Sequence, residues 1–398
     1  MCPDVIRSPP LASKKKRKTM HDSAGALGWL FAILSLSGAL YALGAAVSVR
    51  RFAKRPRPSS GREPALTLLK PLHGLEPLLF ENLSSFCVQD YGGPIQIVLG
   101  ITNPQDGSLR TVARLKAEYP ALDIVLVVDG RVHGANPKVS NLLNMLPSAS
   151  HEILILSDSD IAVPKTYLRD VTAALAEPGI GIVTCLYSGR AGGGFWSQLA
   201  AMGVSYHFLP NAITGTAMKL ASPCVGATIA LKRTVLDEIG GFLSVKDLLA
   251  DDYEIGRRAR ESGYRVRVGP PIVTHFSDEA SAADLFAHEL RWARTIRMLD
   301  IWGHAGSVVT HPFALALLAF AFLPGAFGWL AIAASLAARG VLKISVDRAT
   351  GYRTGAIWLL PLRDLLSFAI FLRSVTGRAV RWREASLRAD RTGTLSQS

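Results

Sequence analysis

Cysteine is scarce in this chain: the 398 residues include four, and no two of them form a CxxC pair. Zinc sites and disulfide frameworks are built from closely spaced cysteines, so the sequence argues against both. We expect the cysteines to be small buried side chains in a reducing compartment.

Two nucleotide-binding fingerprints are also missing, because no GxGxxG follows a predicted strand and GxxxxGK(S/T) does not occur. The dinucleotide-binding and P-loop classes therefore lack their defining motifs.

Acidic residues are outnumbered, with 31 against 44 basic ones and a formal net charge of +13. The surplus lies at the two ends, because residues 1–62 carry +10 and residues 339–398 carry +7. Residues 63–338 carry −4. A nucleic-acid-binding domain places basic residues on its folded surface. The distribution of charge thus argues against a nucleic acid as partner.

Long apolar stretches are abundant, and 49% of the residues are apolar. Residues 24–49 contain no charge and exceed the about 20 apolar residues that cross a bilayer, which predicts a transmembrane helix. Residues 308–338 predict a second transmembrane region, and residues 355–376 a transmembrane or re-entrant helix. The last stretch carries Arg363 and Asp364. A charged pair is tolerated in such a segment when it faces protein or pairs internally.

Basic residues beside these stretches predict the topology, because they favour the cytoplasmic side of a membrane. Residues 50–62 are rich in arginine and place the region 63–300 in the cytoplasm. The basic tail 377–398 is expected on the same side. We therefore predict a multi-pass membrane protein with its catalytic domain on the cytoplasmic face. The basic tail 1–23 conflicts with this topology unless translation starts at Met20.

The region 63–300 has the pattern of an α/β domain. Short apolar runs alternate with helical stretches, and runs of this kind are typical of strands buried on both faces of a parallel or mixed sheet. We predict strands at residues 65–69, 95–101, 124–128, 153–156, 181–186 and 225–231. Ligands of such sheets bind beyond the carboxyl ends of the strands.

Carboxylates follow two of these strands. Asp158 and Asp160 alternate directly after the run 153–156, so both side chains can point to one side. Two hard oxygen ligands suit Mg²⁺ or Mn²⁺ that is shared with a diphosphate. The alternative is an Asx turn or a helix N-cap. Asn103 and Asp106 follow the second predicted strand at the same edge.

A second acidic cluster contains Asp252 at the start of a predicted helix. A carboxylate there could be a general base that deprotonates an alcohol, or it could cap the helix and interact with its dipole. Spacing leaves both interpretations open.

A third cluster, HELRW, contains His288, Arg291 and Trp292 and is followed by Arg294 and Arg297. Arginines spaced by three make a cationic helix face, which suits either a diphosphate or anionic lipid headgroups. Trp292, close to the second membrane region, could also be an interfacial aromatic residue.

In this order and between membrane segments, the three clusters resemble those of processive-type inverting glycosyltransferases of family 2 architecture. They are more similar still to the ceramide glucosyltransferase family and its bacterial hopanoid-associated relatives. The similar segments are LKPLHG at 69–74, GANPKV at 134–139, SDSD at 157–160, DDY at 251–253 and the Arg291-Trp292 pair. The NPK and LKPL segments are more specific than a DxD.

This resemblance implies a GT-A fold, a Rossmann-like mixed sheet, with a UDP-sugar donor, a divalent cation and a lipid alcohol acceptor such as ceramide. By position, Asp158 corresponds to the family's second aspartate motif, and Asp160 completes a DxD. Asp252 corresponds to the third aspartate, the catalytic base. Arg291 and Trp292 correspond to the last two positions of the (Q/R)xxRW motif.

Two positions depart from the family pattern. Asn103 occupies the place of the first aspartate, with Asp106 three residues on, so the uridine contact stays open between them. His288 occupies the first place of (Q/R)xxRW and keeps a hydrogen-bond donor. Lys138 of the NPK segment is expected to assist at the diphosphate.

Other functions compatible with the sequence are glycosyl transfer in hopanoid lipid synthesis, a processive polysaccharide synthase, and a catalytically inactive membrane adaptor. A polysaccharide synthase usually needs more spans to build a channel. The hexose, glucose or N-acetylglucosamine, stays open.

Overall fold

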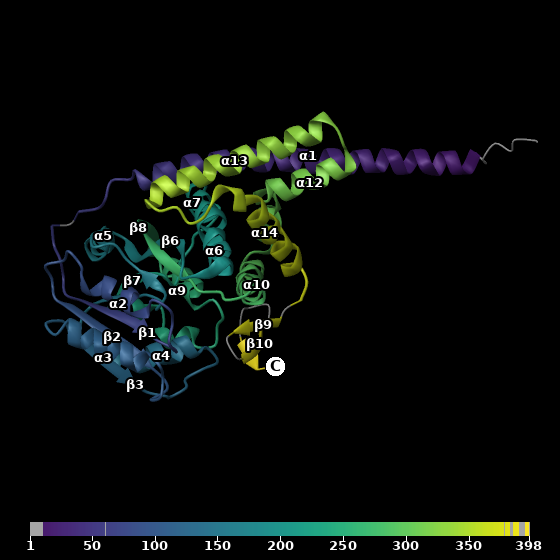
Figure 1. Ribbon diagram of the computed structural model, residues 1–398. Helices are drawn as coiled ribbons and strands as arrows, with labels where there is room; N and C mark the ends of the chain where they lie inside the picture. The colour runs from purple at the N-terminus through teal and green to yellow at the C-terminus, as the bar shows by residue number, and fades with distance from the viewer. Residues whose placement is uncertain (1–10, 60, 378, 383–384, 390–394, 398) are drawn as a thin grey trace, which may run out of the picture.

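The computed structural model describes residues 11–59, 61–377, 379–382, 385–389 and 395–397. An α/β domain lies beside a helical bundle, and helix α1 (Leu11–Ala53) extends beyond the other helices (Figure 1). Residues 1–10 of the basic N-terminal tail lie outside the described residues. The described part of the C-terminal tail forms a small antiparallel sheet of β9 (Ala379–Trp382), β10 (Ala385–Ala389) and β11 (Leu395–Gln397).

The domain is built on one eight-stranded sheet with the order β3-β2-β1-β4-β7-β6-β8-β5. Its strands are β1 (Leu66–Pro71), β2 (Ile95–Ile101), β3 (Asp123–Val128), β4 (Ile153–Leu156), β5 (Ile161–Ala162), β6 (Ile180–Ala191), β7 (Ile229–Lys232) and β8 (Arg265–Ser277). Strands β7 and β5 run opposite to the others. The sheet is therefore mixed, as the apolar runs predict.

Three strands of the sheet differ from expectation, one of which is the two-residue strand β5, which no apolar run predicted. Strand β7 begins at Ile229, because the residues before it form a turn closed by a bridge between Val225 and Thr228. Strand β8 was not predicted, since its burial alternates and its sequence contains no continuous apolar run. β8 extends the sheet on the side opposite to β3 and ends beside the site described below.

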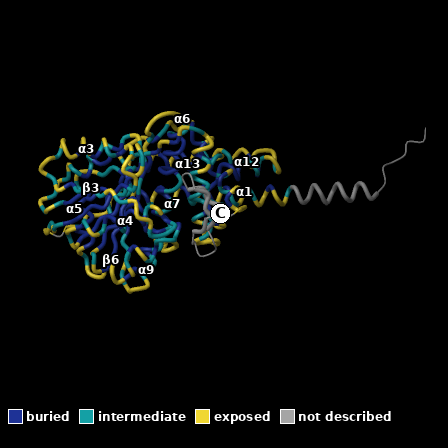
Figure 2. Tube along the Cα trace, turned by 90° about the horizontal axis from the view of Figure 1, so that it is seen from below, coloured by how far each residue is buried: buried dark blue, intermediate teal, exposed yellow. Residues whose placement is uncertain are grey.

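Helices cover both faces of the sheet and enclose two apolar cores, which appear as the dark blue interior in Figure 2. One face is covered by α2 (Leu79–Cys87), α3 (Ser108–Glu118) and α5 (Tyr167–Leu175), and the other by α4 (Pro137–Met145), α8 (Arg233–Glu238) and α9 (Asp251–Glu261). Short 3-10 turns are η1 (Leu146–Ser148) and η3 (Phe242–Val245). Cys185 and Cys224 are buried in these cores as free thiols.

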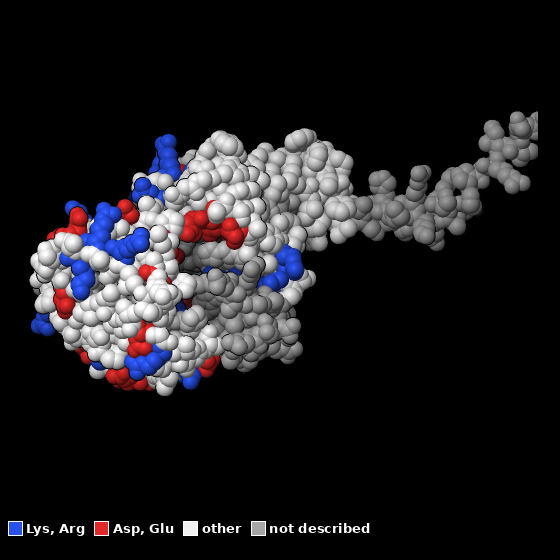
Figure 3. Space-filling view, turned by 60° about the horizontal axis from the view of Figure 1, so that its bottom comes forward, with Lys and Arg blue, Asp and Glu red and all other residues white. Residues whose placement is uncertain are grey.

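Among the residues that the structure describes, two helices are long and apolar enough to cross a membrane, residues Gly25–Ala53 of α1 and α13 (Ala326–Thr350). The segment from α11 (Ile301–Gly306) through η4 (Ser307–Thr310) is bent by 68° against α12 (Pro312–Phe322) and makes a third candidate if the pair is one span. A turn at residues 323–325 therefore divides the expected region 308–338, and α13 continues beyond it. The exposed face of the bundle in Figure 3 carries few charged side chains.

Helix α14 (Leu360–Ser374) has 15 residues, fewer than the about 20 that cross a bilayer. Its Arg363 and Asp364 are both buried. Arg363 pairs with Glu289 of α10 (Ala282–Leu299), and Asp364 pairs with Arg339 of α13 at 2.7 Å. The charged pair thus faces protein, the arrangement that makes such residues tolerable beside a membrane.

A third core joins the domain to the bundle. It contains residues of α6 (Gly194–Gly203), η2 (Val204–Phe208) and α7 (Leu209–Ala217), an insertion between β6 and β7, together with α1, α13, η5 (Ile357–Leu359) and α14. The α/β domain is therefore packed directly on the candidate membrane helices.

Candidate active site

A buried glycine, Gly226, joins the two acidic clusters. Its carbonyl accepts a hydrogen bond from the Asp158 amide at 3.2 Å, and its own amide donates to Asp252 Oδ2 at 2.9 Å. Asp158 follows β4 and Asp252 lies in the first turn of α9, so the turn before β7 holds the two carboxylates at one end of the sheet. Sequence reasoning missed Gly226, because nothing local to the run 225–231 indicates its partners.

Lys138 lies between the same two acidic clusters. Its Nζ is 2.7 Å from Asp158 Oδ1 and 3.6 Å from Asp251 Oδ2. Although burial disfavours the ammonium ion, Asp158 and Asp251 raise the pKa of Lys138. Lys138 therefore lies at the site, as expected, and its ammonium group is paired with the carboxylates of Asp158 and Asp251.

Local chemistry explains how the NPK segment presents this lysine. Asn136 is the N-cap of α4, and its Oδ1 accepts a hydrogen bond from the Val139 amide at 3.1 Å. Pro137 occupies the first turn, where a missing N–H costs nothing. Asn136 Nδ2 also donates to the Leu248 carbonyl at 2.8 Å, which ties α4 to the loop before α9.

A second lysine, Lys70 of the LKPLHG segment, lies fully buried beneath the SDSD loop. Its Nζ donates to Ser157 Oγ at 3.3 Å and to the Asp158 carbonyl at 2.5 Å, and lies 3.9 Å from the centre of the Phe86 ring. Burial lowers the pKa of Lys70 to about 7, against the opposing effect of Asp158. Sequence reasoning gave this residue no role, and the structure shows it as a support for the loop.

The environment of Asp252 is suited to proton transfer. Its Oδ1 accepts a hydrogen bond from the Tyr253 amide at 2.7 Å, in addition to the bond from Gly226. Burial and the negative charge of Asp251 raise the pKa of Asp252 to about 6, while Lys138 opposes the rise. A carboxylate with a pKa near the working pH can accept a proton and still be ionised.

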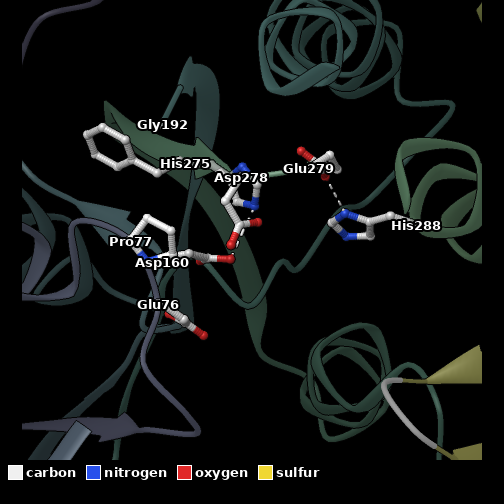
Figure 4. Close-up of a pocket in the computed structure, with 9 residues that line it drawn as sticks. Glu76, Pro77, Asp160, Gly192, His275, Asp278, Glu279 and His288 are labelled. Atoms are coloured by element: carbon white, nitrogen blue, oxygen red, sulfur yellow. Dashed lines mark hydrogen bonds and ion pairs between the residues drawn. The ribbon is translucent and has the colours of Figure 1, made fainter. Parts of the chain in front are cut away.

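Asp160 faces a different group of residues, shown in Figure 4. Its Oδ2 lies 3.2 Å from Nε2 of His275 on β8. His288 of α10 pairs through Nδ1 with Glu279 Oε1 at 2.7 Å. The Trp292 ring centroid is 4.4 Å from that of His288 and 6.0 Å from that of His275. Through β8, the structure brings the HELRW helix next to the SDSD loop.

The remaining expected site residues have other positions. Arg291 lies on α10 near Tyr187, where its charge opposes the rise that burial causes in the pKa of Tyr187. Asp106 accepts hydrogen bonds from the Gly74 and Ser108 amides, both at 2.8 Å, and so holds the LKPLHG loop against the start of α3. Asn103 is exposed, and its Oδ1 accepts from the Gln105 amide at 2.9 Å. Asp106 thus joins two segments of the chain, whereas the hydrogen bond of Asn103 is local.

Arg294 and Arg297 were expected to face either a diphosphate or anionic lipid headgroups, but in the structure both bind backbone carbonyls. Arg294 donates to the Thr376 carbonyl at 3.1 Å, and Arg297 donates to the Gly377 carbonyl at 2.6 Å and to the Val375 carbonyl. These carbonyls directly follow the C-terminal end of α14, where cations are favoured. The arginines therefore fasten α14 to α10.

A family model described as "Glycosyl transferase family 21" matches residues 30–395, which is nearly the whole chain. The chain belongs to glycosyl transferase family 21.

Curated proteins similar to this family 21 member include two from Caenorhabditis elegans. "Ceramide glucosyltransferase 3" is 25% identical over 232 residues, 58% of this chain and 50% of that protein. "Ceramide glucosyltransferase 1" is 21% identical over 273 residues, 66% of this chain and 58% of that protein. "Beta-monoglucosyldiacylglycerol synthase" of Synechocystis is 27% identical over 249 residues, 60% of this chain and 50% of that protein. The matches span about half the length of these relatives.

Among solved structures, the mannosyltransferase PcManGT from Pyrobaculum calidifontis, in complex with GDP-Man and Mn²⁺, is similar with a TM-score of 0.50 and 21% identity. The similarity covers 88% of this chain and 99% of that one. It shows the fold alone, and with the mixed sheet it supports the GT-A architecture of this family 21 member.

The donor set of this family 21 member fits a divalent cation that is shared with a ligand. No three His, Cys, Asp or Glu side chains in the described part of the chain converge to hold a metal ion by themselves. Asp160 Oδ1 is buried and has no hydrogen-bond partner among the described residues. Asp158 and Asp160 could thus supply carboxylate oxygens, while a diphosphate supplies others.

Proposed function

We propose that this protein transfers a hexose from a UDP-sugar to a lipid alcohol, with inversion at the anomeric carbon. The observation that carries the proposal is the pair of aspartates joined by Gly226, which accepts from the Asp158 backbone amide and donates to the Asp252 carboxylate. Asp252, whose pKa is raised to about 6, is thereby held beside Asp158 at the ends of the strands. One carboxylate can act as a base while the other serves the diphosphate. Membership of family 21 and similarity to ceramide glucosyltransferases support the same reaction.

In this mechanism, the UDP-sugar binds over the carboxyl ends of the strands, and Asn103 or Asp106 contacts the uridine. Asp158 and Asp160 would hold Mg²⁺ or Mn²⁺, which offsets charge on the leaving diphosphate. Lys138 and Arg291 add positive charge at the same place. No basic surface of the domain is needed, since these groups act locally.

Asp252 then takes the proton of the acceptor hydroxyl as its oxygen attacks the anomeric carbon in line. The bond to the diphosphate oxygen breaks on the opposite side, so the configuration inverts. His288, Arg291 and Trp292 close the site over the diphosphate and the acceptor head.

The acceptor is presented from the membrane. In this proposal α1 spans the bilayer, and the domain 63–300 and the tail 377–398 both lie on the cytoplasmic face. That topology needs an even number of crossings between them, which the bent segment α11–η4–α12 and α13 supply, while α14 lies at the membrane surface. The third core places the domain against the candidate spans. A single transfer is favoured over polysaccharide synthesis, because the described part of the chain offers two or three candidate spans rather than a channel.

We expect activity to rise with pH across the pKa of Asp252. Below about pH 6 the carboxyl is protonated and cannot accept the acceptor proton, and above it the carboxylate is available. A profile of kcat/KM from about one pH unit below that pKa to about two above it checks this. A profile that is flat across this interval would contradict the assignment of the base.

Gly226→Ala is expected to lower kcat/KM by at least about 10-fold. A Cβ at this position would lie 2.6 Å from Asp158 Oδ2 and 2.9 Å from Lys138 Nζ, so the pair at the centre of the site must shift. Steady-state kinetics measures the loss. Gly44→Ala is the control, because a Cβ there meets nothing within 4 Å.

The direct test uses the purified protein in lipid nanodiscs with Mn²⁺ and UDP-glucose or UDP-N-acetylglucosamine. Ceramide, diacylglycerol and a hopanoid alcohol are supplied separately, and products are identified by mass spectrometry. We expect one hexose to be added to one of these lipids, with release of UDP. Long glycan chains would indicate a polysaccharide synthase. No UDP release with any lipid would indicate an inactive adaptor, and either result would refute the proposal.

A further inference from the structure

A pocket beside Asp160 is not accounted for by the mechanism above. It lies between the loop after β1, the SDSD loop, the end of β8 and the start of α10 (Figure 4). Its lining residues are Glu76, Pro77, Asp160, Gly192, His275, Phe276, Asp278, Glu279 and His288. Neither Asp158 nor Asp252 is among them, so within the described residues the pocket is separate from the carboxylates on Gly226.

The lining of this pocket is unsuited to an anion. Four of its side chains are carboxylates, two are imidazoles, and none is lysine or arginine. Both imidazoles are turned to carboxylates, His275 to Asp160 and His288 to Glu279. The diphosphate, which needs cations, therefore belongs on the Lys138 side of the SDSD loop.

One carboxylate oxygen of the pocket lining is buried without a partner. Glu279 is 8% exposed, and its Oε2 makes no hydrogen bond to any described residue. Asp160 Oδ1 is in the same state but is the oxygen assigned above to the cation. Buried polar groups are ordinarily hydrogen-bonded. The free oxygen of Glu279, in a lining rich in carboxylates, therefore indicates a ligand that donates hydrogen bonds.

A neutral polyol meets these requirements better than a cation does. Hydroxyl groups donate to carboxylates without adding a charge that must be balanced, and a site that hydrogen-bonds hydroxyls discriminates strongly between ligands. No three side chains in the described part of the chain converge as metal ligands, which disfavours a second cation in the pocket.

We propose that this pocket binds the hydroxyl groups of a hexose, with Glu279 and Asp278 as acceptors, and that it sets the preference for the sugar. The inference rests on the proposed function. It names the hexose of the donor, because Asp160 forms one wall of the pocket and, in the proposed mechanism, also serves the diphosphate to which that hexose is attached. His288 acts as a positioning residue, since its pair with Glu279 holds one carboxylate oxygen and leaves the other for the ligand.

The test compares the binding of UDP-glucose with that of UDP, both in Mn²⁺, by titration calorimetry on the full chain. Glu279→Gln keeps the shape of the side chain and removes the charged acceptor. We expect UDP-glucose to bind about 10–100-fold more weakly, while UDP binds as before. Asp284→Asn is the matched control, because Asp284 is an exposed carboxylate of α10 outside the pocket. Asp278→Asn is a second test variant. Asp278 is an exposed residue of the pocket lining, so its replacement should not affect folding.

Each outcome decides the question. If donor binding is unchanged but the KM for the lipid acceptor rises about 10-fold, the pocket binds hydroxyl groups of the acceptor head. The pocket is then still a site for hydroxyl groups, but the ligand is the acceptor rather than the hexose of the donor. If neither changes in either variant, or if UDP and UDP-glucose weaken equally, the hexose site is refuted. Failure of the proposed function looks different, because the unmodified protein would then show no transfer from any UDP-sugar.

Discussion

The Asp252→Asn variant is expected to lose about 10²–10⁴-fold in kcat while binding UDP nearly as tightly as the unmodified protein. Asparagine has the size of aspartate, and its oxygen can still accept from the Gly226 amide, which keeps the turn before β7 in place. It has no basic oxygen that can take the acceptor proton. Single-turnover kinetics with UDP-sugar and lipid measures the chemical step, and calorimetry with UDP measures binding.

The neighbouring carboxylate provides the control. Asp251 lies 3.6 Å from Lys138 Nζ and accepts from Asn136 Nδ2 at 3.3 Å, so it supports the site without the proposed role as base. Asp251→Asn should therefore weaken donor binding and leave kcat within about 10-fold of normal. Normal turnover in Asp252→Asn, or a deeper loss in Asp251→Asn, would assign the base to another residue.

Arg363→Met is expected to lower the free energy of unfolding by about 3–5 kcal/mol, since it leaves a buried carboxylate without its partner. Arg363 is among the most buried side chains, pairs with Glu289, and donates to the Leu199 carbonyl at 3.2 Å and to Ser367 Oγ at 3.0 Å. It therefore joins α14, α10 and α6 at once. Glu289 directly precedes the stretch that carries Arg291 and Trp292, so the same change should also reduce transfer.

Thermal unfolding in nanodiscs measures this effect. The double variant Arg363→Met with Glu289→Gln should recover part of the stability, because the uncompensated charge is removed. Arg373→Met is the control, because this arginine lies on the same helix but is exposed and its side chain bonds only to Thr376 in the described part of the chain, so its loss should cost less than about 1 kcal/mol. If the single and double variants unfold alike, the pair itself contributes little.

Some features follow from the sequence because their causes are local. Apolar length without charge predicted the helices around residues 24–49 and 326–338, and the run 153–156 predicted β4, which is buried on both faces. Local capping by Asn136 and Pro137 is sufficient to start α4. The motifs also predicted the family, since LKPL, NPK and RW are specific in type and order.

Other features depend on which strands become neighbours. The order β4-β7-β6-β8 places Gly226 beside Asp158 and brings His275 to Asp160, although each pair is separated by more than 60 residues of chain. Gly226 also binds Asp252, 26 residues further on. The sequence left Arg294 and Arg297 open between a diphosphate and lipid headgroups. In the structure they bind carbonyls after α14, because α10 and α14 pack together.

Residue type and short-range spacing therefore determined the candidate membrane helices, the class of domain and the family. The tertiary structure decided which groups share a site, because the pairing of distant strands is set by burial summed over the whole sheet rather than by any one segment. That pairing supplied Gly226 as the link between two carboxylates, Lys70 as the buried support of the SDSD loop, and the carboxylate-lined pocket beside Asp160.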